Sequence, residues 1–284
     1  MIQKFKEAAK GKNSNIGIGL GISEDQNQKI LQASLNFVRS NKANVYLFGN
    51  SSHINSLREQ TPENYLNSRV KFIECQNPEF TILSSLIDDR IQSIVRGSMS
   101  SNKFLTNLKD ELKVKKINRL ALLETYFGQE FFFGPVGIDE CNNLKNKTHF
   151  LNLAIHILHE FEINPRISIL SGGRKSDIGR DRKVDKLIQD ADKIVHIFKE
   201  KNKKLEISHN EILIEQAIES NSNLIIAPDG ISGNLIYRTL VHLGGGKAYG
   251  AIYMGLKNII VDTSRVGDIS EIQGALLLAL ALSK

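Results

Sequence analysis

Cysteine is scarce in this chain, and its cysteines and histidines form no metal-binding motif. Cys75 and Cys141 are the only two cysteines; they lie far apart, and no CxxC pair is present. This spacing gives neither a redox pair nor the cysteine–histidine clusters that bind zinc. The histidines are scattered, among them His156, His159, His196, His209 and His242. We therefore expect no metal site and a protein of the reducing cytoplasm.

Long apolar runs and a strong charge of one sign are also lacking. The longest apolar run, ALLLALAL at residues 275–282, is far too short to span a bilayer, and the opening MIQKFKEAAKGKN has no apolar signal core. The 37 basic and 31 acidic residues leave a formal charge of only +6. This mild excess suits an anionic small molecule as well as a nucleic acid. No basic stripe with interleaved aromatics is present, so we expect neither a nucleic acid nor a membrane as partner.

What the sequence does contain is a regular alternation of strand-like and helix-like segments. Residues 44–49 and 70–75 are apolar, β-prone runs, whereas residues 23–40 and 182–201 carry apolar side chains at helical spacing. Such alternation predicts an α/β fold with mainly parallel sheets and helices on their faces. Two strand-like runs at residues 119–137 predict one hairpin within this pattern.

The sequence also indicates where the chain passes from one domain to another. A polar stretch with two glycines, GPVGIDECNNLKNK, begins at residue 134. We predict a first α/β domain of residues 1–140 plus 262–284 and a second α/β domain of residues 141–261, with a ligand cleft between them. In open parallel sheets, ligands bind beyond the carboxyl ends of the strands, so the segments that follow the predicted strands are the places to search.

The strand RISIL is followed by a loop of small and basic residues. The loop consists of Ser171, Gly172, Gly173, Arg174, Lys175 and Ser176. Glycines let backbone amides approach an anion closely, and arginine provides a two-pronged donor for phosphate. The spacing matches neither the P-loop nor the dinucleotide fingerprint. We predict a phosphate-binding loop here; the alternative is a solvated, mobile basic loop.

Two other strand exits carry polar residues that fit either a ligand or a helix cap. In IAPDGISGNLIYRTL, Asp229, Gly233 and Asn234 stand on a glycine-rich elbow between a strand and a helix. In IVRGSMSS, Arg96 and Ser98 follow a short apolar segment. Asp, Asn and Ser are also the residues that cap helices, so a purely structural role competes with ligand binding at both places.

A fourth exit, IIVDTSRVGDISEIQ, combines a hydroxyl, a guanidinium and a carboxylate. Ser264 and Arg265 follow the strand, and Glu271 stands on the opening turn of the last helix. These groups can supply a hydrogen-bond donor, an anion clamp and a general base. The alternative is a helix entry whose acidic residues complement the helix dipole.

Several of these stretches resemble known acyl-phosphate enzymes. PDGISGNLIYRTL and the later NIIVDTSR resemble the C-terminal block of phosphate acetyltransferases and butyryltransferases, and the DG-x-x-GN form is similar to the phosphate acyltransferase PlsX. NIGIGLGISEDQNQKILQAS resembles the opening strand and helix of that family, so the likeness covers nearly the whole chain. The layout and the GGRKSDIGRDRK loop are most similar to methanogenesis marker protein 4, also called MtxX, a family named as a methyltransferase subunit X.

The resemblance implies a fold and a set of roles. The fold would be that of the isocitrate and isopropylmalate dehydrogenases, with two α/β/α domains. Ser264 and Arg265 match the catalytic Ser-Arg of the acetyltransferases, and Glu271 stands where those enzymes keep an Asp that deprotonates the coenzyme A thiol; Asp268 is the rival base. Coenzyme A or a related thiol would be a substrate, with no tightly bound cofactor, and a homodimer is usual for the family.

Three functions compete on these grounds. The first is a phosphate acyltransferase that moves an acyl group between phosphate and a thiol in the cleft, where Asn234 would position the acyl end. The second is an accessory subunit without catalysis, which binds a phosphorylated metabolite beside a methyltransferase partner. The third is a metal-dependent dehydrogenase, which we rank last because Asp229 and Asp262 stand at separate strand exits without a run of metal-binding aspartates.

Overall fold

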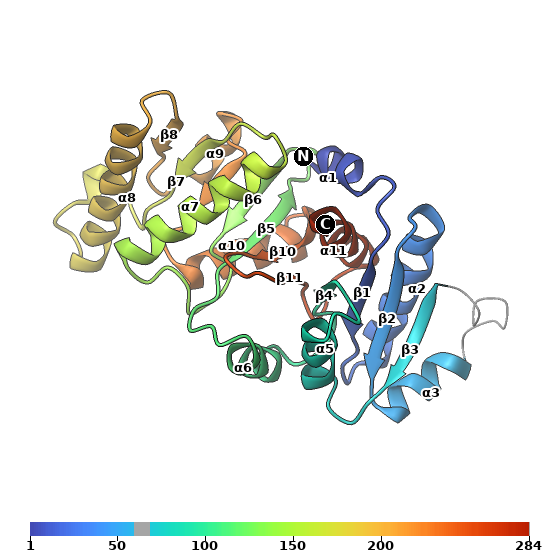
Figure 1. The fold of residues 1–284 in the computed structure, drawn as a ribbon. Coiled ribbons are helices and arrows are strands. Elements are labelled where there is room, and N and C mark those ends of the chain that lie inside the picture. Colours follow the sequence, from blue (N-terminus) through green and yellow to red (C-terminus); the bar gives the residue numbers. More distant parts are fainter. Residues whose placement is uncertain (60–68, 284) are drawn as a thin grey trace. The chain divides into compact units, whose positions relative to one another are not determined.

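The computed structural model describes residues 1–59 and 69–283 and contains two compact units. The terminal unit consists of Ile2–Ile117 together with Ala248–Lys284, and the central unit consists of Met1 together with Asn118–Lys247. Figure 1 shows the elements of both, coloured along the chain. These units follow from internal contacts, and the two-domain division expected from the sequence stays a prediction.

The terminal unit has a mainly parallel sheet with the strand order β3-β2-β1-β4-β11-β10. Its strands are β1 (Asn15–Gly19), β2 (Asn44–Gly49), β3 (Val70–Glu74), β4 (Ser93–Val95), β10 (Lys247–Tyr253) and β11 (Ile259–Asp262). Each pair of neighbouring strands in this order is parallel except β11 and β10, which are antiparallel. The central strand β1 is buried along nearly its whole length, as expected for a parallel strand covered on both faces.

Amphipathic helices cover this sheet. They are α1 (Ile2–Ala9), α2 (Glu24–Ser40), α3 (Ser51–Glu59), α5 (Pro78–Ile87), α6 (Ser101–Glu111) and α11 (Ile269–Leu282). Helix α2 begins where the sequence predicts, because the Ser23 hydroxyl accepts a hydrogen bond from the Gln26 amide at 3.4 Å. Helix α11, which carries the ALLLALAL run, is buried nearly all round.

The central unit has its strands in the order β5-β6-β9-β7-β8. Its strands are β5 (Arg119–Glu124), β6 (Glu130–Gly134), β7 (Arg166–Ile169), β8 (Glu206–His209) and β9 (Leu224–Ile226). Strands β5 and β6 form the predicted antiparallel hairpin, and its phenylalanine triplet, residues 131–133, is buried. The other pairs are parallel, so β6, β9, β7 and β8 all end at the same edge of the sheet.

The helices of the central unit follow its parallel strands. They are α7 (Leu144–Glu160), α8 (Arg182–Lys201), α9 (Ile214–Glu219) and α10 (Gly230–His242), with a 3₁₀ turn, η1 (Lys175–Asp177). Helix α7 begins at Leu144, because the Asn143 side chain accepts from the Asn146 amide at 2.9 Å and caps it. Mainly parallel strands with helices in the connections confirm the predicted α/β fold class.

Candidate functional site

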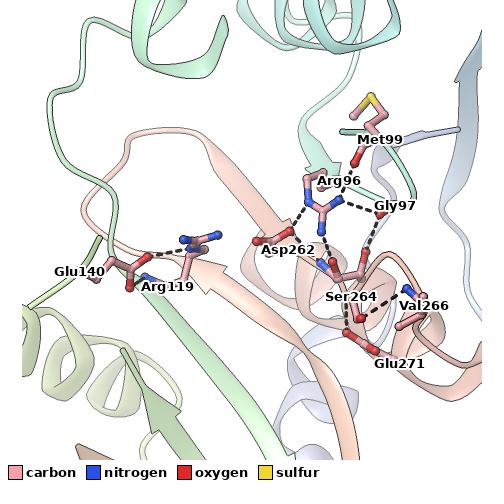
Figure 2. Close-up of polar contacts among 10 residues, drawn as sticks. Arg96, Gly97, Met99, Arg119, Glu140, Asp262, Ser264, Val266 and Glu271 are labelled. Atoms are coloured by element: carbon pink, nitrogen blue, oxygen red, sulfur yellow. Dashed lines mark hydrogen bonds and ion pairs between the residues drawn. The ribbon is translucent and has the colours of Figure 1, made fainter. Parts of the chain in front are cut away.

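Arg96 and Asp262 form a buried ion pair where two neighbouring strands of the terminal unit end. Strands β4 and β11 pair with Val95 opposite Val261, so the next residue of each reaches the same edge of the sheet. Arg96 Nε donates to Asp262 Oδ1, and Arg96 Nη1 donates to the carbonyl oxygen of Met99 at 2.7 Å (Figure 2). Only 4% of Arg96 is exposed. The guanidinium therefore braces two strand exits, and its role in ligand binding stays a prediction.

Ser98 connects the β4 exit to the β1 exit. Its hydroxyl donates to Asn27 Oδ1 at 2.8 Å and accepts from the Gly21 amide at 2.7 Å. The preceding Gly97 has φ +66°, and a Cβ there would overlap the carbonyl oxygen of Gly19, so glycine is required on two grounds. The sequence offered no signal for Asn27, which lies inside the predicted helix 23–40.

A buried carboxylate, that of Glu271, binds the backbone of the Ser264 turn after β11. The Ser264 amide donates to Glu271 Oε1 at 2.7 Å, and the Val266 amide donates to the Ser264 hydroxyl oxygen at 3.3 Å (Figure 2). Glu271 is only 3% exposed, and it lies on the first turn of α11. The structure therefore brings Ser264 and Glu271 together, and the contact runs through the backbone amide of Ser264. This geometry is that of a positioning residue.

The two other charged residues of this turn face solvent. Arg265 is exposed, whereas Ser264 is half-buried. The Asp268 side chain is 84% exposed and lies 3.9 Å from the ammonium of Lys29. Of the two candidate bases, Asp268 is thus the accessible carboxylate and Glu271 the enclosed one.

The strand exits of the central unit lie side by side and carry the other predicted residues. The Leu170 amide donates to Ile226 O at 2.8 Å, and the Ala227 amide donates to Gly134 O at 2.7 Å. The loop that follows β7 and the elbow that follows β9 therefore start from adjacent points of one sheet edge. The structure thus groups the predicted residues of this unit at the carboxyl ends of its parallel strands.

Ser171 begins a chain of hydrogen bonds that the sequence did not reveal. Its Oγ lies 2.9 Å from His209 Nε2, and His209 Nδ1 lies 2.8 Å from Asp192 Oδ1. Lys175 Nζ lies 3.2 Å from the same Asp192 oxygen. Burial alone would raise the pKa of Asp192, but hydrogen bonds from His209 and Lys175 outweigh it and lower the pKa. The order of contacts is that of a serine-hydrolase triad.

The burial of Ser171 gives this chain a positioning role. Ser171 is 1% exposed, and its hydroxyl donates to the carbonyl oxygen of Gly173 at 2.8 Å. A hydroxyl has one proton, so a donation to Gly173 requires His209 Nε2 to donate in turn. His209 Nδ1 faces the Asp192 carboxylate in turn, so the contacts of His209 hold the 171–173 turn in place.

The glycines of this loop lie against α8, and its cations face solvent. A Cβ on Gly172 or Gly173 would lie 2.8 Å from Leu187 Cδ1 or 2.6 Å from Val184 Cγ1. Arg174, Lys175 and Ser176 are exposed. The first amides of α8 are already capped by Asp181, whose Oδ1 accepts from residues 183 and 184 at 2.8 and 3.1 Å. An anion would therefore meet the loop amides and side chains, not the helix N-terminus.

The Pro-Asp-Gly elbow is built against the β6 exit. Asp229 caps α10 by accepting from the Ser232 amide at 2.8 Å, and Asn234 Nδ2 donates to the carbonyl of Val136 at 2.9 Å. A Cβ on Gly233 would overlap the carbonyl oxygen of Pro135. The contacts are those of a cap and a tight packing site, which is the structural alternative stated from the sequence; the ligand roles of Asp229 and Asn234 stay predictions.

A buried ion pair between Arg119 and Glu140 stabilises the same exit. Arg119 Nε donates to Glu140 Oε1 at 2.7 Å, and the Arg119 amide donates to Oε2 at 3.1 Å (Figure 2). Burial raises the pKa of Glu140, and the charge and hydrogen bonds of Arg119 only partly offset it. Neither residue stands in a motif, so sequence reasoning had no signal by which to find them.

Lys147 is a buried lysine on the first turn of α7. It is 4% exposed, and its Nζ lies 3.9 Å from Asp190 Oδ2. Burial lowers the pKa of Lys147, and the carboxylates of Asp190 and Asp229 partly oppose this shift. Lys147 is thus close enough to the elbow at residue 229 to interact electrostatically with Asp229.

In residues 1–59 and 69–283, no group of histidine, cysteine and acidic side chains is placed to hold a metal ion. Within the same residues, no helix combines the length and the apolar character needed to cross a membrane.

Comparisons with known proteins agree on one family. Residues 91–280 match the sequence profile of the family described as "Phosphate acetyl/butaryl transferase". The protein named "Putative methyltransferase mtx subunit X" from Methanosarcina barkeri is 38% identical over 259 residues, which are 91% of this chain and 90% of that protein.

Solved structures with little sequence similarity share the fold. A phosphotransacetylase from Streptococcus pyogenes superposes with a TM-score of 0.72 at 15% identity, covering 98% of this chain and 96% of its own. A 4-hydroxythreonine-4-phosphate dehydrogenase from Klebsiella pneumoniae gives a TM-score of 0.59 at 10% identity, covering 94% and 99%. Phosphotransacetylases and dehydrogenases are thus both built on the fold of this chain.

Proposed function

Because the chain belongs to the phosphate acetyl/butyryl transferase family, we propose that it binds a phosphorylated or coenzyme A-type ligand and transfers an acyl group between phosphate and a thiol. The family assignment supports the class of ligand. The choice of residues rests on the geometry of the two strand-exit loops described above.

The observation that carries the proposal is the construction of the Ser264 turn. Its backbone is fixed by Glu271 and by the Arg96–Asp262 pair, while Ser264 remains half-buried and Arg265 is exposed. A turn fixed by buried groups that still presents a hydroxyl and a guanidinium is preorganised for an anion. Within the central unit, the exposed Arg174 and Lys175 on the glycine loop after β7 are a separate phosphate contact that we propose.

The proposed reaction forms no covalent intermediate with the protein. The thiolate sulfur attacks the acyl carbon of the acyl phosphate, the bond from that carbon to the bridging oxygen breaks, and phosphate leaves. Ser264 donates to the oxygen that gains charge during the attack, and a carboxylate takes the thiol proton. Asp268 is placed to take that proton from solvent-accessible substrate, whereas Glu271 positions the Ser264 amide.

The test is a thioester-forming assay with acetyl phosphate and coenzyme A. A preorganised donor of this kind contributes about 3 kcal/mol to the barrier, so Ser264→Ala should lower kcat by roughly a hundredfold or more. Thr106→Ala removes an exposed hydroxyl on α6 and should leave kcat unchanged. Equal kcat in wild type and Ser264→Ala would remove Ser264 from the mechanism.

A second candidate function is that of an accessory subunit that binds the same ligand without turnover. The enclosed position of Glu271 favours it, because the carboxylate predicted as the base is 3% exposed and bonded to a backbone amide. The methyltransferase name of the Methanosarcina barkeri relative is the basis for proposing a methyltransferase partner. Calorimetry with coenzyme A and with acetyl phosphate, beside the thioester assay, separates the two: binding without turnover supports the accessory role. A cytoplasmic homodimer stays a prediction in either case.

A further inference from the structure

The terminal unit contains a pocket with a strongly one-sided charge. Its volume is about 740 Å³, and it is lined by α1, the C-terminal turn of α2, the residue before β3, β10 and α11. None of the predicted site residues lines it. Five basic side chains line it, and no acidic side chain does: Lys6, Lys10, Arg39, Lys42 and Arg69. The chain as a whole has 37 basic and 31 acidic residues, so this segregation departs from its average composition.

The capping of α2 does not account for all these cations. Basic residues near a helix C-terminus are favoured by the helix dipole. The last carbonyls of α2 already have donors, since Asn41 donates to Phe37 O through its amide at 3.1 Å and its side chain at 3.0 Å, and Arg69 donates to Val38 O. Lys42 is therefore not needed as a cap.

The remaining lining suits an organic anion better than a bare one. Ala9, Phe37 and Leu277 give the pocket an apolar floor, and each is at most 9% exposed. Tyr249 lies against Gly274 of α11, where any Cβ would overlap it. The volume is in the range of roughly 300–1,000 Å³ that is typical of small-molecule sites, and a single phosphate would leave most of it empty.

We propose that this pocket binds a nucleotide, with the base on the apolar floor and two or more phosphate charges among the lysines. The acidic residue nearest in sequence on α1, Glu7, accepts from Gln3 at 3.3 Å and does not line the pocket. Positive potential in a concave site raises the local concentration of anions and falls with ionic strength. The proposal concerns binding at the terminal unit and does not depend on acyl transfer at Ser264.

Calorimetry with ADP, pyrophosphate and adenosine as probes tests the proposal on the full chain. ADP should bind most tightly, because it alone has both the base and the paired phosphates. Lys10→Glu with Lys42→Glu should weaken ADP binding by about tenfold or more, since two attractions become repulsions. The matched control is Lys103→Glu with Lys257→Glu, which changes the net charge equally at exposed positions outside the pocket and should leave the affinity unchanged.

A neutral variant separates binding inside the pocket from long-range attraction. Ser40 is exposed and lines the pocket, so Ser40→Trp places an indole in the hollow without changing charge and should weaken ADP binding. Three results would each overturn the proposal: no ADP binding by wild type, equal losses in the two charge variants, or pyrophosphate binding as tight as ADP. Thioester formation is not a readout, so failure here leaves the acyl-transfer proposal standing.

Discussion

Removal of the Glu271 carboxylate should loosen the Ser264 turn by an amount that the structure sets. Glu271→Ala deletes the acceptor of the Ser264 amide, a 2.7 Å hydrogen bond to a charged group. Such a bond contributes about 1.5–3 kcal/mol. Local opening of the turn should therefore become more frequent, and the Ser264 amide should exchange its hydrogen roughly 10- to 150-fold faster than in wild type.

Glu271→Gln is the matched variant, because it keeps an acceptor oxygen at the same reach and removes only the charge. A neutral hydrogen bond contributes about 1 kcal/mol, which is about 0.5–2 kcal/mol less than the charged one, so exchange at Ser264 should rise by only about 2- to 30-fold over wild type. Amide exchange followed by mass spectrometry on peptides that cover residues 263–268 provides the measurement. Equal exchange rates in the alanine variant and in wild type would refute the view that Glu271 holds the turn.

The same pair of variants distinguishes a positioning role from a base. If Glu271 positions Ser264, the glutamine variant should keep most of the thioester-forming activity, whereas Asp268→Asn should lose it. A base at Glu271 predicts the reverse order, because glutamine cannot accept a thiol proton. A reversed order with normal Ser264 exchange would move the proton transfer from Asp268 to Glu271.

Two other predictions concern stability and reactivity. Gly97→Ala should destabilise the terminal unit by about 2 kcal/mol or more, because the new Cβ overlaps Gly19 O and the backbone at φ +66° is strained for alanine. Gly11→Ala is the control, since Gly11 has φ +81° but no atom within 4 Å of the new Cβ, and it should cost only about 1 kcal/mol. Urea unfolding measures both losses of stability. Burial raises the pKa of both Cys75 and Cys141, and Cys141 is the more enclosed of the two. Iodoacetamide at pH 8 should therefore label Cys75 first, as followed by mass spectrometry. Faster labelling of Cys141 would contradict its burial.

The sequence was sufficient for those features that depend on local pattern. The α/β class follows from alternating apolar runs, and the starts of α2 and α8 follow from residues that cap within their own turn, such as Ser23. The location of the glycine loop at residues 171–176 also follows, since a loop after a parallel strand must emerge at one edge of the sheet. Each of these inferences needs only neighbours within a few positions of the chain.

Partners that meet through strand register were beyond the sequence. Ser171 reaches His209 because β7 and β8 pair with Ile169 opposite His209, which sets the two residues at adjacent strand ends. Asp192 lies in the middle of α8, and no sequence motif links it to Ser171 or His209. Arg119 and Glu140 likewise meet only after the β5–β6 hairpin has turned the chain back.

The buried charged residues of this chain fix its backbone, whereas some exposed ones stand where a ligand can reach them. This difference guides the choice of functional residues. Hydrogen bonds from within the protein hold the side chains of Arg96, Arg119 and Glu271, which in turn fix the backbone. Substitution of any of the three should therefore disturb the structure first. Arg174 and Arg265 are exposed at strand exits, where a ligand can reach them. An anion that binds at either strand exit should therefore lose affinity when the exposed arginine of that exit is substituted, without a loss of stability, because removing an exposed charge typically changes stability by less than about 0.5 kcal/mol.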